Sequence, residues 1–327
     1  MMNKAINTLV LATVDSLTKF KNKLAYYLAI FAMVFGSTFG TFNAANAGDL
    51  TKTATAVISA SEIANIGTDD LILSENDTTA LLATIAFTGP NVSDIIMGTN
   101  DTVANATTVL FAPGASALVF SANIKGREAT NSSESNNIRI ESSVDDAASQ
   151  LVTLSGDISN GGNAKGAIDT LKVGSATAAG NVLFSGDVAA VAVTVFGGNH
   201  LDEDGIANFR KDLAVTSVTL DDATGQSSAI FSAASAEDIE GTIDGADDFN
   251  GTLQITGTDI TFDGVIGGTK DIGTLDVDSS VIFNAAVSSQ TVTVAAAKTA
   301  QFDAALTAAN ITLADSTAIL KVIGNVT

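Results

Sequence analysis

The chain has 327 residues with 36 acidic and 15 basic side chains, a formal net charge of −21, and no cysteine. The lack of cysteine excludes disulfides and thiolate chemistry, and the negative charge argues against binding to nucleic acid or anionic lipid headgroups. A hydrophobic content of 46% is too high for a disordered chain. The many Val, Ile, Thr and Gly residues, with only two prolines, favour an all-β protein with many turns.

The first segment in chain order, residues 1–47, has the pattern of a signal peptide with an extended basic region. Three lysines between residues 19 and 23 precede an apolar stretch from Leu24 to Phe42, and Ala45-Asn46-Ala47 supplies the small residues of a cleavage site. We expect cleavage near Ala47 and a mature protein at the cell surface, in the outer membrane or outside the cell. An uncleaved membrane anchor is the alternative, because the apolar stretch is nearly long enough to span a bilayer.

Residues 48–180 are predicted to form a less regular β-solenoid segment. Short apolar stretches such as Ile85-Ala-Phe87, Val109-Leu-Phe111 and Leu118-Val-Phe120 have the pattern of buried strands. Between them, residues 127–150 are a polar insertion with one plausible strand around Ile138 to Ile140. We expect this insertion to project from the solenoid as a loop.

Residues 181–327 are predicted to form regular repeats. Phe262-Asp-Gly-Val-Ile266, Phe283-Asn-Ala-Ala-Val287 and Phe302-Asp-Ala-Ala-Leu306 follow one another at nearly equal spacing, with alternating stretches such as Thr291–Val294 between them. Self-similarity of this short period is typical of a solenoid, in which stacked coils bury one continuous core. We therefore predict a right-handed parallel β-helix with roughly 20-residue coils, with Phe and aliphatic residues inside and Thr and Asp outside. Chance similarity in an antiparallel sandwich is the alternative.

Two further repeats support a solenoid. Leu154-Ser-Gly-Asp-Ile158 resembles Phe184-Ser-Gly-Asp-Val188, and Ile168–Ser175 matches Ile272–Ser279 at five of eight positions. The sequence stops on a strand-like segment, Ala318–Thr327, without a capping helix. We expect either that the chain is truncated at its C-terminus or that a partner covers this end.

The sequence offers little for catalysis. His200 is the only histidine, tryptophan is absent, and both tyrosines lie in the predicted signal peptide. Acidic residues beside glycine recur at Asp202 and Asp204, at residues 221–222 and at residues 244–248, but without the spacing of a calcium loop. We expect no catalytic, cofactor-binding or metal-binding residues and no enzymatic activity. Weak calcium binding at Asp202 and Asp204 is the open alternative.

The extended signal peptide, the Cys-free acidic composition and the repeats Ile168–Val188 and Ile272–Val287 resemble the passenger domains of autotransporter surface antigens. The resemblance extends to rickettsial surface cell antigens and surface-layer-forming outer-membrane proteins. It implies a displayed β-helix that acts as an adhesin, an antigen or a surface coat. It also implies outer-membrane association through a part not present in this chain. The partners would be a host or neighbouring-cell surface, or copies of the protein itself. A self-assembling surface-layer or filament subunit, and a β-helical polysaccharide-acting enzyme or fibre, are the alternatives.

Overall fold

Parallel strands make up the whole of the described fold. The computed structural model separates into two units, Met1–Asn46 and Ala47–Thr327. It describes residues 50–52, 56–57, 71–73, 78–82, 94–97, 106–112, 117–126, 135–141, 151–159, 167–198, 204–222, 225–233 and 237–327, all in the second unit. The predicted signal peptide lies outside the described residues. Within them, no helix is long and apolar enough to cross a membrane.

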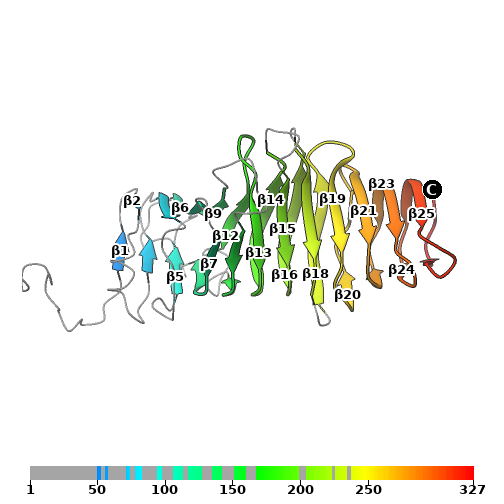
Figure 1. Cartoon of the computed structure of the whole chain (residues 1–327), viewed down its shortest axis with the longest axis horizontal. Coiled ribbons are helices and arrows are strands. Elements are labelled where there is room, and N and C mark those ends of the chain that lie inside the picture. Colours follow the sequence, from blue (N-terminus) through cyan, green and yellow to red (C-terminus); the bar gives the residue numbers. More distant parts are fainter. Residues whose placement is uncertain are drawn as a thin grey trace, which may run out of the picture. The chain divides into compact units, whose positions relative to one another are not determined.

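One face of the second unit is a nine-stranded sheet in which each strand pairs in parallel with the strand of the next coil. Figure 1 shows its strands following one another along the solenoid, from green through orange. The sheet consists of β7 (Leu118–Phe120), β10 (Val152–Leu154), β13 (Asn181–Phe184), β15 (Gly205–Phe209), β17 (Ser227–Phe231), β19 (Asn250–Ile255), β21 (Ile272–Val277), β23 (Val287–Val294) and β25 (Leu306–Leu313).

The other 17 strands form a second sheet, which bends into two rows. Three long strands belong to both rows: β14 (Val188–Phe196), β16 (Leu213–Asp221) and β18 (Glu237–Gly245). Row 1 contains their first halves and β1 (Leu50–Lys52), β3 (Leu71–Leu73), β5 (Asp94–Met97), β8 (Asn123–Gly126), β11 (Ile158–Ser159), β20 (Ile260–Phe262), β22 (Val281–Phe283), β24 (Thr299–Phe302) and β26 (Ile319–Val322). Row 2 contains their second halves and β2 (Ala56–Val57), β4 (Thr78–Leu82), β6 (Ala106–Ala112), β9 (Ser135–Ile140) and β12 (Ile168–Val173).

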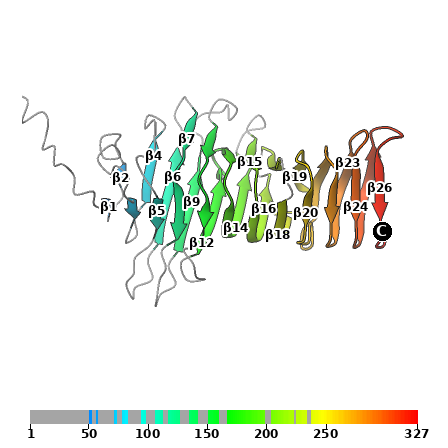
Figure 2. The same ribbon diagram turned by 90° about the horizontal axis from the view of Figure 1, so that it is seen from below.

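The chain visits the nine-stranded sheet, row 1 and row 2 in that order, and then returns to the nine-stranded sheet one coil further along. After β18, row 2 is continued by single bridges from Ile243 to Ile266 and from Ile266 to Val287. Figure 2 shows row 2 from the side, with β4, β6, β9, β12 and β14 in succession. The all-β, parallel β-helical fold predicted from the sequence is therefore confirmed.

Coil length varies along the solenoid, and the predicted length holds near its C-terminal end and in the first described coil, where Leu50 pairs with Leu71. There, Phe262, Phe283, Phe302 and Val322 are successive register partners in row 1, so each short interval between them is one coil. Further towards the N-terminus, the row 1 partners Ile95, Ile124 and Ile158 are separated by much longer stretches of sequence. The strands of these longer coils do not exceed seven residues, as in β6, while β23 and β25 of the shorter coils have eight, so most of the additional residues lie between strands.

Phenylalanine rings form a column through the core. The rings of Phe184, Phe209 and Phe231 close strands of the nine-stranded sheet, and successive centroids are 5.0 and 5.3 Å apart. The column then continues from Phe231 to Phe262 of row 1, at 5.1 Å, and on through Phe283 and Phe302, at 5.3 and 4.7 Å. The predicted alignment of the FNAAV and FDAAL motifs is confirmed, because Phe283 pairs with Phe302 and Val287 pairs with Leu306.

The repeated Ser-Gly-Asp corner joins the nine-stranded sheet to row 1. Leu154 pairs with Phe184, and Ile158 pairs with Val188, so the two copies occupy the same position on neighbouring coils. The Asp187 backbone N–H donates to the Asp157 carboxylate at 3.0 Å. A polar side chain at this corner thus accepts a hydrogen bond from the backbone of the next coil, which supplies a partner to an N–H outside the sheet ladders.

Two expectations need correction. The strand predicted around Ile138 to Ile140 is present as β9, but it is a rung of row 2 paired with β6 and β12 and not part of a projecting loop; residues 127–134 and 142–150 lie outside the described residues. In addition, Phe196 and Phe249 do not join the core. Phe196 is partly exposed and Phe249 is 49% exposed with a φ of 69°.

Candidate ligand-binding groove

Row 2 carries a polar outer surface on β6, β9 and β12. Ile138, Ile140, Leu171 and Val173 alternate into the core and are fully buried, so the residues between them face outward. Register pairs Thr108 with Asn137 and Asn137 with Thr170. Further along the same strands, Arg139 is paired with Lys172.

Side-chain contacts hold this surface in place. An Nη atom of Arg139 forms an ion pair with the Glu141 carboxylate, and the Thr170 hydroxyl donates to the Asn137 side-chain oxygen. The side chains of Arg139 and Glu141 are 41% and 20% exposed. Lys172 is exposed, and no carboxylate of the described residues forms an ion pair with it. Two cationic side chains therefore lie on neighbouring strands, and one of them, Arg139, is ion-paired with Glu141.

A tight turn after β12 forms one wall beside this surface. Gly174 begins it with a φ of 81°, and a Cβ atom at this position would lie 2.9 Å from the carbonyl oxygens of Ala178 and Phe196. Ser175 and Ala178 close the turn with backbone hydrogen bonds of 2.7 and 3.3 Å. Only glycine combines this backbone angle with such close packing, so Gly174 brings the turn against the end of β14, where Phe196 lies.

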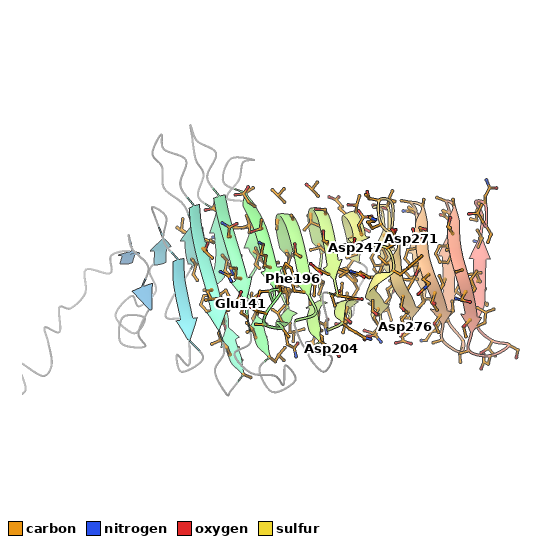
Figure 3. All side chains as sticks on the ribbon, turned by 90° about the horizontal axis from the view of Figure 1, so that it is seen from above. Glu141, Phe196, Asp204, Asp247, Asp271 and Asp276 are labelled. Atoms are coloured by element: carbon orange, nitrogen blue, oxygen red, sulfur yellow. The ribbon has the colours of Figure 1, made fainter. Side chains whose placement is uncertain are left out.

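The outer surface of β6, β9 and β12 and the turn after β12 border an open groove of about 460 Å³. Figure 3 labels two of its residues, Glu141 and Phe196. The groove is lined by Thr108, Asn137, Arg139, Glu141, Thr170, Lys172, Gly174, Ser175, Ala176 and Phe196. It combines hydroxyl and amide groups, a charged trio and one aromatic ring, which is a set suited to binding a polar ligand.

Beside the groove, β9 begins with a buried amide. Asn136 is fully buried and its side-chain N–H donates to the Ala167 carbonyl at 3.1 Å, while its backbone N–H donates to the Asp169 carboxylate at 2.8 Å. Partial burial raises the pKa of Asp169, and the hydrogen bond from Asn136 opposes that rise. Asp169 thus holds the start of β9 in place. Because side chains alternate along a strand, this also determines which of the following residues of β9 face outward.

A second hollow, of about 310 Å³, lies on the outer side of β20, β22 and β24. Its lining includes Asp259, Ser280 and Gln301, together with the 39% exposed side chain of Ile282. It contains no basic side chain and no aromatic ring. The groove on row 2 is therefore the better candidate for a functional site.

The acidic residues singled out from the sequence do not converge. His200 and Asp202 lie outside the described residues, and Asp204 is exposed. Asp222 accepts hydrogen bonds from Ser227 and from the Gly251 backbone, and Asp244 accepts one from the Thr269 backbone. No group of three or more His, Asp or Glu side chains in the described part of the chain is placed to hold a metal ion. Asp222 and Asp244 instead accept hydrogen bonds that connect neighbouring coils.

The groove residues were not singled out from the sequence, although one signal was present. In the stretch Val193-Thr-Val195-Phe196, the strict alternation puts both valines inside and therefore requires Phe196 to face outward. A large aromatic residue on the outer side of a strand indicates a binding surface. Arg139 and Lys172 occupy the corresponding outward positions in their own strands, but only the register brings them together.

No family model, curated protein or solved structure matches the chain.

Proposed function

We propose that the protein is an exported bacterial surface protein of the autotransporter-passenger type, which acts as an adhesin, an antigen or a structural surface coat. One observation carries the proposal. The inside of the solenoid repeats from coil to coil, whereas its connections vary, since the row 1 step from Ile124 to Ile158 is far longer than the step from Phe283 to Phe302. Such a construction keeps a rigid scaffold while its surface varies, as extended binding and display proteins require.

The charge and the N-terminal pattern support the same proposal. A net charge of −21 keeps an extended surface soluble and free of nonspecific contact with polyanions. Stability without cysteine comes from stacked cores and intercoil hydrogen bonds, which need no particular redox environment. Residues 1–47 supply the export pattern. In this proposal the solenoid functions by binding, and its side chains take no catalytic role.

Export can be tested by expressing the full chain in a Gram-negative host and determining the mature N-terminus by mass spectrometry. We expect Gly48 as the first residue, and we expect Ala47→Asp to abolish cleavage while Ala44→Ser leaves it unchanged. A membrane-impermeant amine reagent applied to intact cells should then label the exposed Lys211. An intact N-terminus with labelled Lys211 would identify an uncleaved membrane anchor, and an intact N-terminus with unlabelled Lys211 would overturn export. Cleavage without labelling of intact cells would place the protein in the periplasm and overturn surface display by this chain alone.

A self-assembling surface-layer or filament subunit is the second candidate, and one observation favours it. Apolar side chains of the last strand and the residues after it are exposed: Ile319 by 52%, Ile323 by 61% and Val326 by 57%. Stacked coils of any origin, from this chain or from a second copy, would cover these side chains, and an assembly measurement separates the two. Concentration-dependent growth in sedimentation coefficient, abolished by Ile323→Asp, would favour this candidate. A monomer at all concentrations would contradict it.

A further inference from the structure

We propose that the groove on row 2 is a binding site for a saccharide that carries a carboxylate, such as a uronate-containing glycan. The site consists of the Arg139–Lys172 pair, the hydroxyl and amide groups beside it, and the Phe196 ring. This inference does not depend on export or surface display, so either proposal can fail without the other.

The paired cations are the first argument. Like charges directly opposite each other on neighbouring strands repel and destabilise a sheet, yet Arg139 and Lys172 are register partners. Glu141 offsets part of this repulsion through its ion pair with Arg139. The three side chains carry a net charge of +1, in a chain whose total is −21. An anionic group bound between Arg139 and Lys172 would remove the remaining repulsion.

The geometry of the cations favours a carboxylate. Arginine presents a planar fork of donors that matches two carboxylate oxygens, and Lys172 adds a mobile point charge next to it. Glu141 accepts from one Nη atom of Arg139, and both side chains line the groove, so the other guanidinium donors remain for a ligand there. Polyanions such as nucleic acids and sulfated polymers would meet the repulsion of the whole acidic chain. A short uronate oligomer carries only a few charges and meets much less of this repulsion.

The remainder of the lining favours a sugar over a peptide. Thr108, Asn137, Thr170 and Ser175 offer hydroxyl and amide groups, which exchange hydrogen bonds with sugar hydroxyls. Phe196 is partly exposed at the end of the groove, where its ring can pack against the C–H face of a pyranose. Eight of the ten described phenylalanines are fully buried in the core, and of the other two, Phe196 lines the groove while Phe249 does not.

The groove is also pre-organised. Its floor consists of paired strands, and its wall is the hydrogen-bonded turn between Ser175 and Ala178. Little conformational entropy is lost when a ligand binds to such a surface. An open shape allows a linear glycan to run across the coils, since only one of its sugars needs to occupy the charged position.

Calorimetric titration of the full chain, purified in mild detergent, tests the proposal with trigalacturonate as the probe. We expect saturable binding to trigalacturonate and binding at least about tenfold weaker to its methyl ester, because the ester cannot form the charge-assisted hydrogen bonds. Lys172→Gln and Arg139→Gln should each weaken trigalacturonate binding about tenfold, and Phe196→Ala should weaken binding of both probes. Lys270→Gln is the matched control, since Lys270 pairs with Asp248 outside the groove. It should leave the affinity unchanged.

A second measurement on the unmodified protein guards against variants that fail to fold. Trigalacturonate should protect Lys172 from acetylation and leave the reactivity of Lys270 unchanged. Equal affinity for acid and methyl ester would overturn the proposal, as would equal protection of the two lysines or an absence of binding at millimolar ligand. Tighter binding to a sulfated polymer that also depends on Lys172 would replace the carboxylate proposal with one for polyanions.

Discussion

The coils up to Phe231 and the coils after it place the phenylalanine ring of the core at two different positions. In the three coils that contain β13, β15 and β17, a phenylalanine ends the strand of the nine-stranded sheet, and a smaller aliphatic residue lies in the adjacent segment of row 1. In the later coils the sizes are reversed. The earlier pairs are Phe184 with Val188, Phe209 with Leu213 and Phe231 with Ile239, and the later pairs are Ile255 with Phe262, Val277 with Phe283 and Val294 with Phe302.

The difference shows that the core conserves volume per coil and not residue type per position. Each of these coils supplies one ring to the column, and the column stays continuous because Phe231 and Phe262 are in contact across the change. Protein cores tolerate exchanges that keep total volume and lose stability when volume is added or removed at one site. Four predictions test whether the two sets of coils form a single column.

Removing a ring from either set should have the largest effect. Phe209→Ala and Phe283→Ala each delete a fully buried ring and should lower the free energy of unfolding by about 3–5 kcal/mol. The measurement is the urea midpoint at unchanged m-value. Phe249→Ala, which truncates a ring that is 49% exposed, is the control and should cost about 0.5 kcal/mol or less. A large loss for only one of the two buried rings would mean that the column is not shared.

Between Phe231 and Phe262 the phenylalanine column passes from the nine-stranded sheet to row 1, and we call this place the crossover. Exchanging the large and the small side chain there tests volume conservation directly. Ile255→Phe adds a ring beside Phe231, its register partner, and should cost about 1–3 kcal/mol through overpacking. Phe262→Ile alone leaves a void. The double variant restores the volume and should be more stable than the sum of the single effects by at least about 1 kcal/mol in a double-mutant cycle. Additive effects would contradict the volume rule.

The connection across the crossover should contribute less. The Asp222 carboxylate accepts hydrogen bonds from the Ser227 backbone at 2.8 Å, the Ser227 hydroxyl at 2.7 Å and the Gly251 backbone of the next coil at 2.8 Å. Asp222→Ala leaves these donors without an acceptor and should cost about 1–1.5 kcal/mol. The Gly251 backbone N–H should then exchange faster with solvent, which would show that the lost stability comes from this hydrogen bond. Asp247→Ala, at an exposed position, should leave both the stability and that exchange rate unchanged.

The smallest effect concerns Asp276, on the outer side of the later coils. Partial burial raises its pKa from 3.8, and the nearby negative charge of Asp278 adds to the rise. The folded state therefore holds the proton more tightly than the unfolded state, so the resulting stabilisation is complete below about pH 3.8 and is lost as the pH rises through the folded-state pKa. Asp276→Asn should raise stability at pH 7 by about 0.5 kcal/mol or less. The gain in stability should disappear in acid, below about pH 3.8. Urea titrations at pH 7 and in acid measure it, and a loss of stability at pH 7 would contradict the prediction.

Local sequence patterns determined the fold class, because alternation and repeated corners report which residues face inward. They did not determine which side of a coil a strand occupies. Ile168–Ser175 and Ile272–Ser279 match in sequence, yet β12 belongs to row 2 and β21 belongs to the nine-stranded sheet. A strand followed by a turn satisfies the same local rules on any side of the solenoid. Only stacking against neighbouring coils selects the side.

The groove was less predictable for a related reason. Arg139 and Lys172 are far apart in sequence and become neighbours only through the register of β9 and β12. That register depends on the length of the connection between them, which no local rule fixes. Phe196 could have been recognised from alternation alone, since its side follows from the two buried valines before it. The charged part of the site required the three-dimensional stacking.

The register of row 1 also decides which pieces of this chain are interchangeable. Phe262 and Phe283 occupy equivalent places on adjacent turns, so duplicating or excising the segment between them would lengthen or shorten the protein by one whole coil. The same edit made between Phe231 and Phe262 would fuse two different sides of the coil, and every later residue would be displaced by one side. Internal duplication therefore preserves the stacking when the duplicated segment runs between register partners, which across the change of sheets are Phe231 and Ile255 or Ile239 and Phe262.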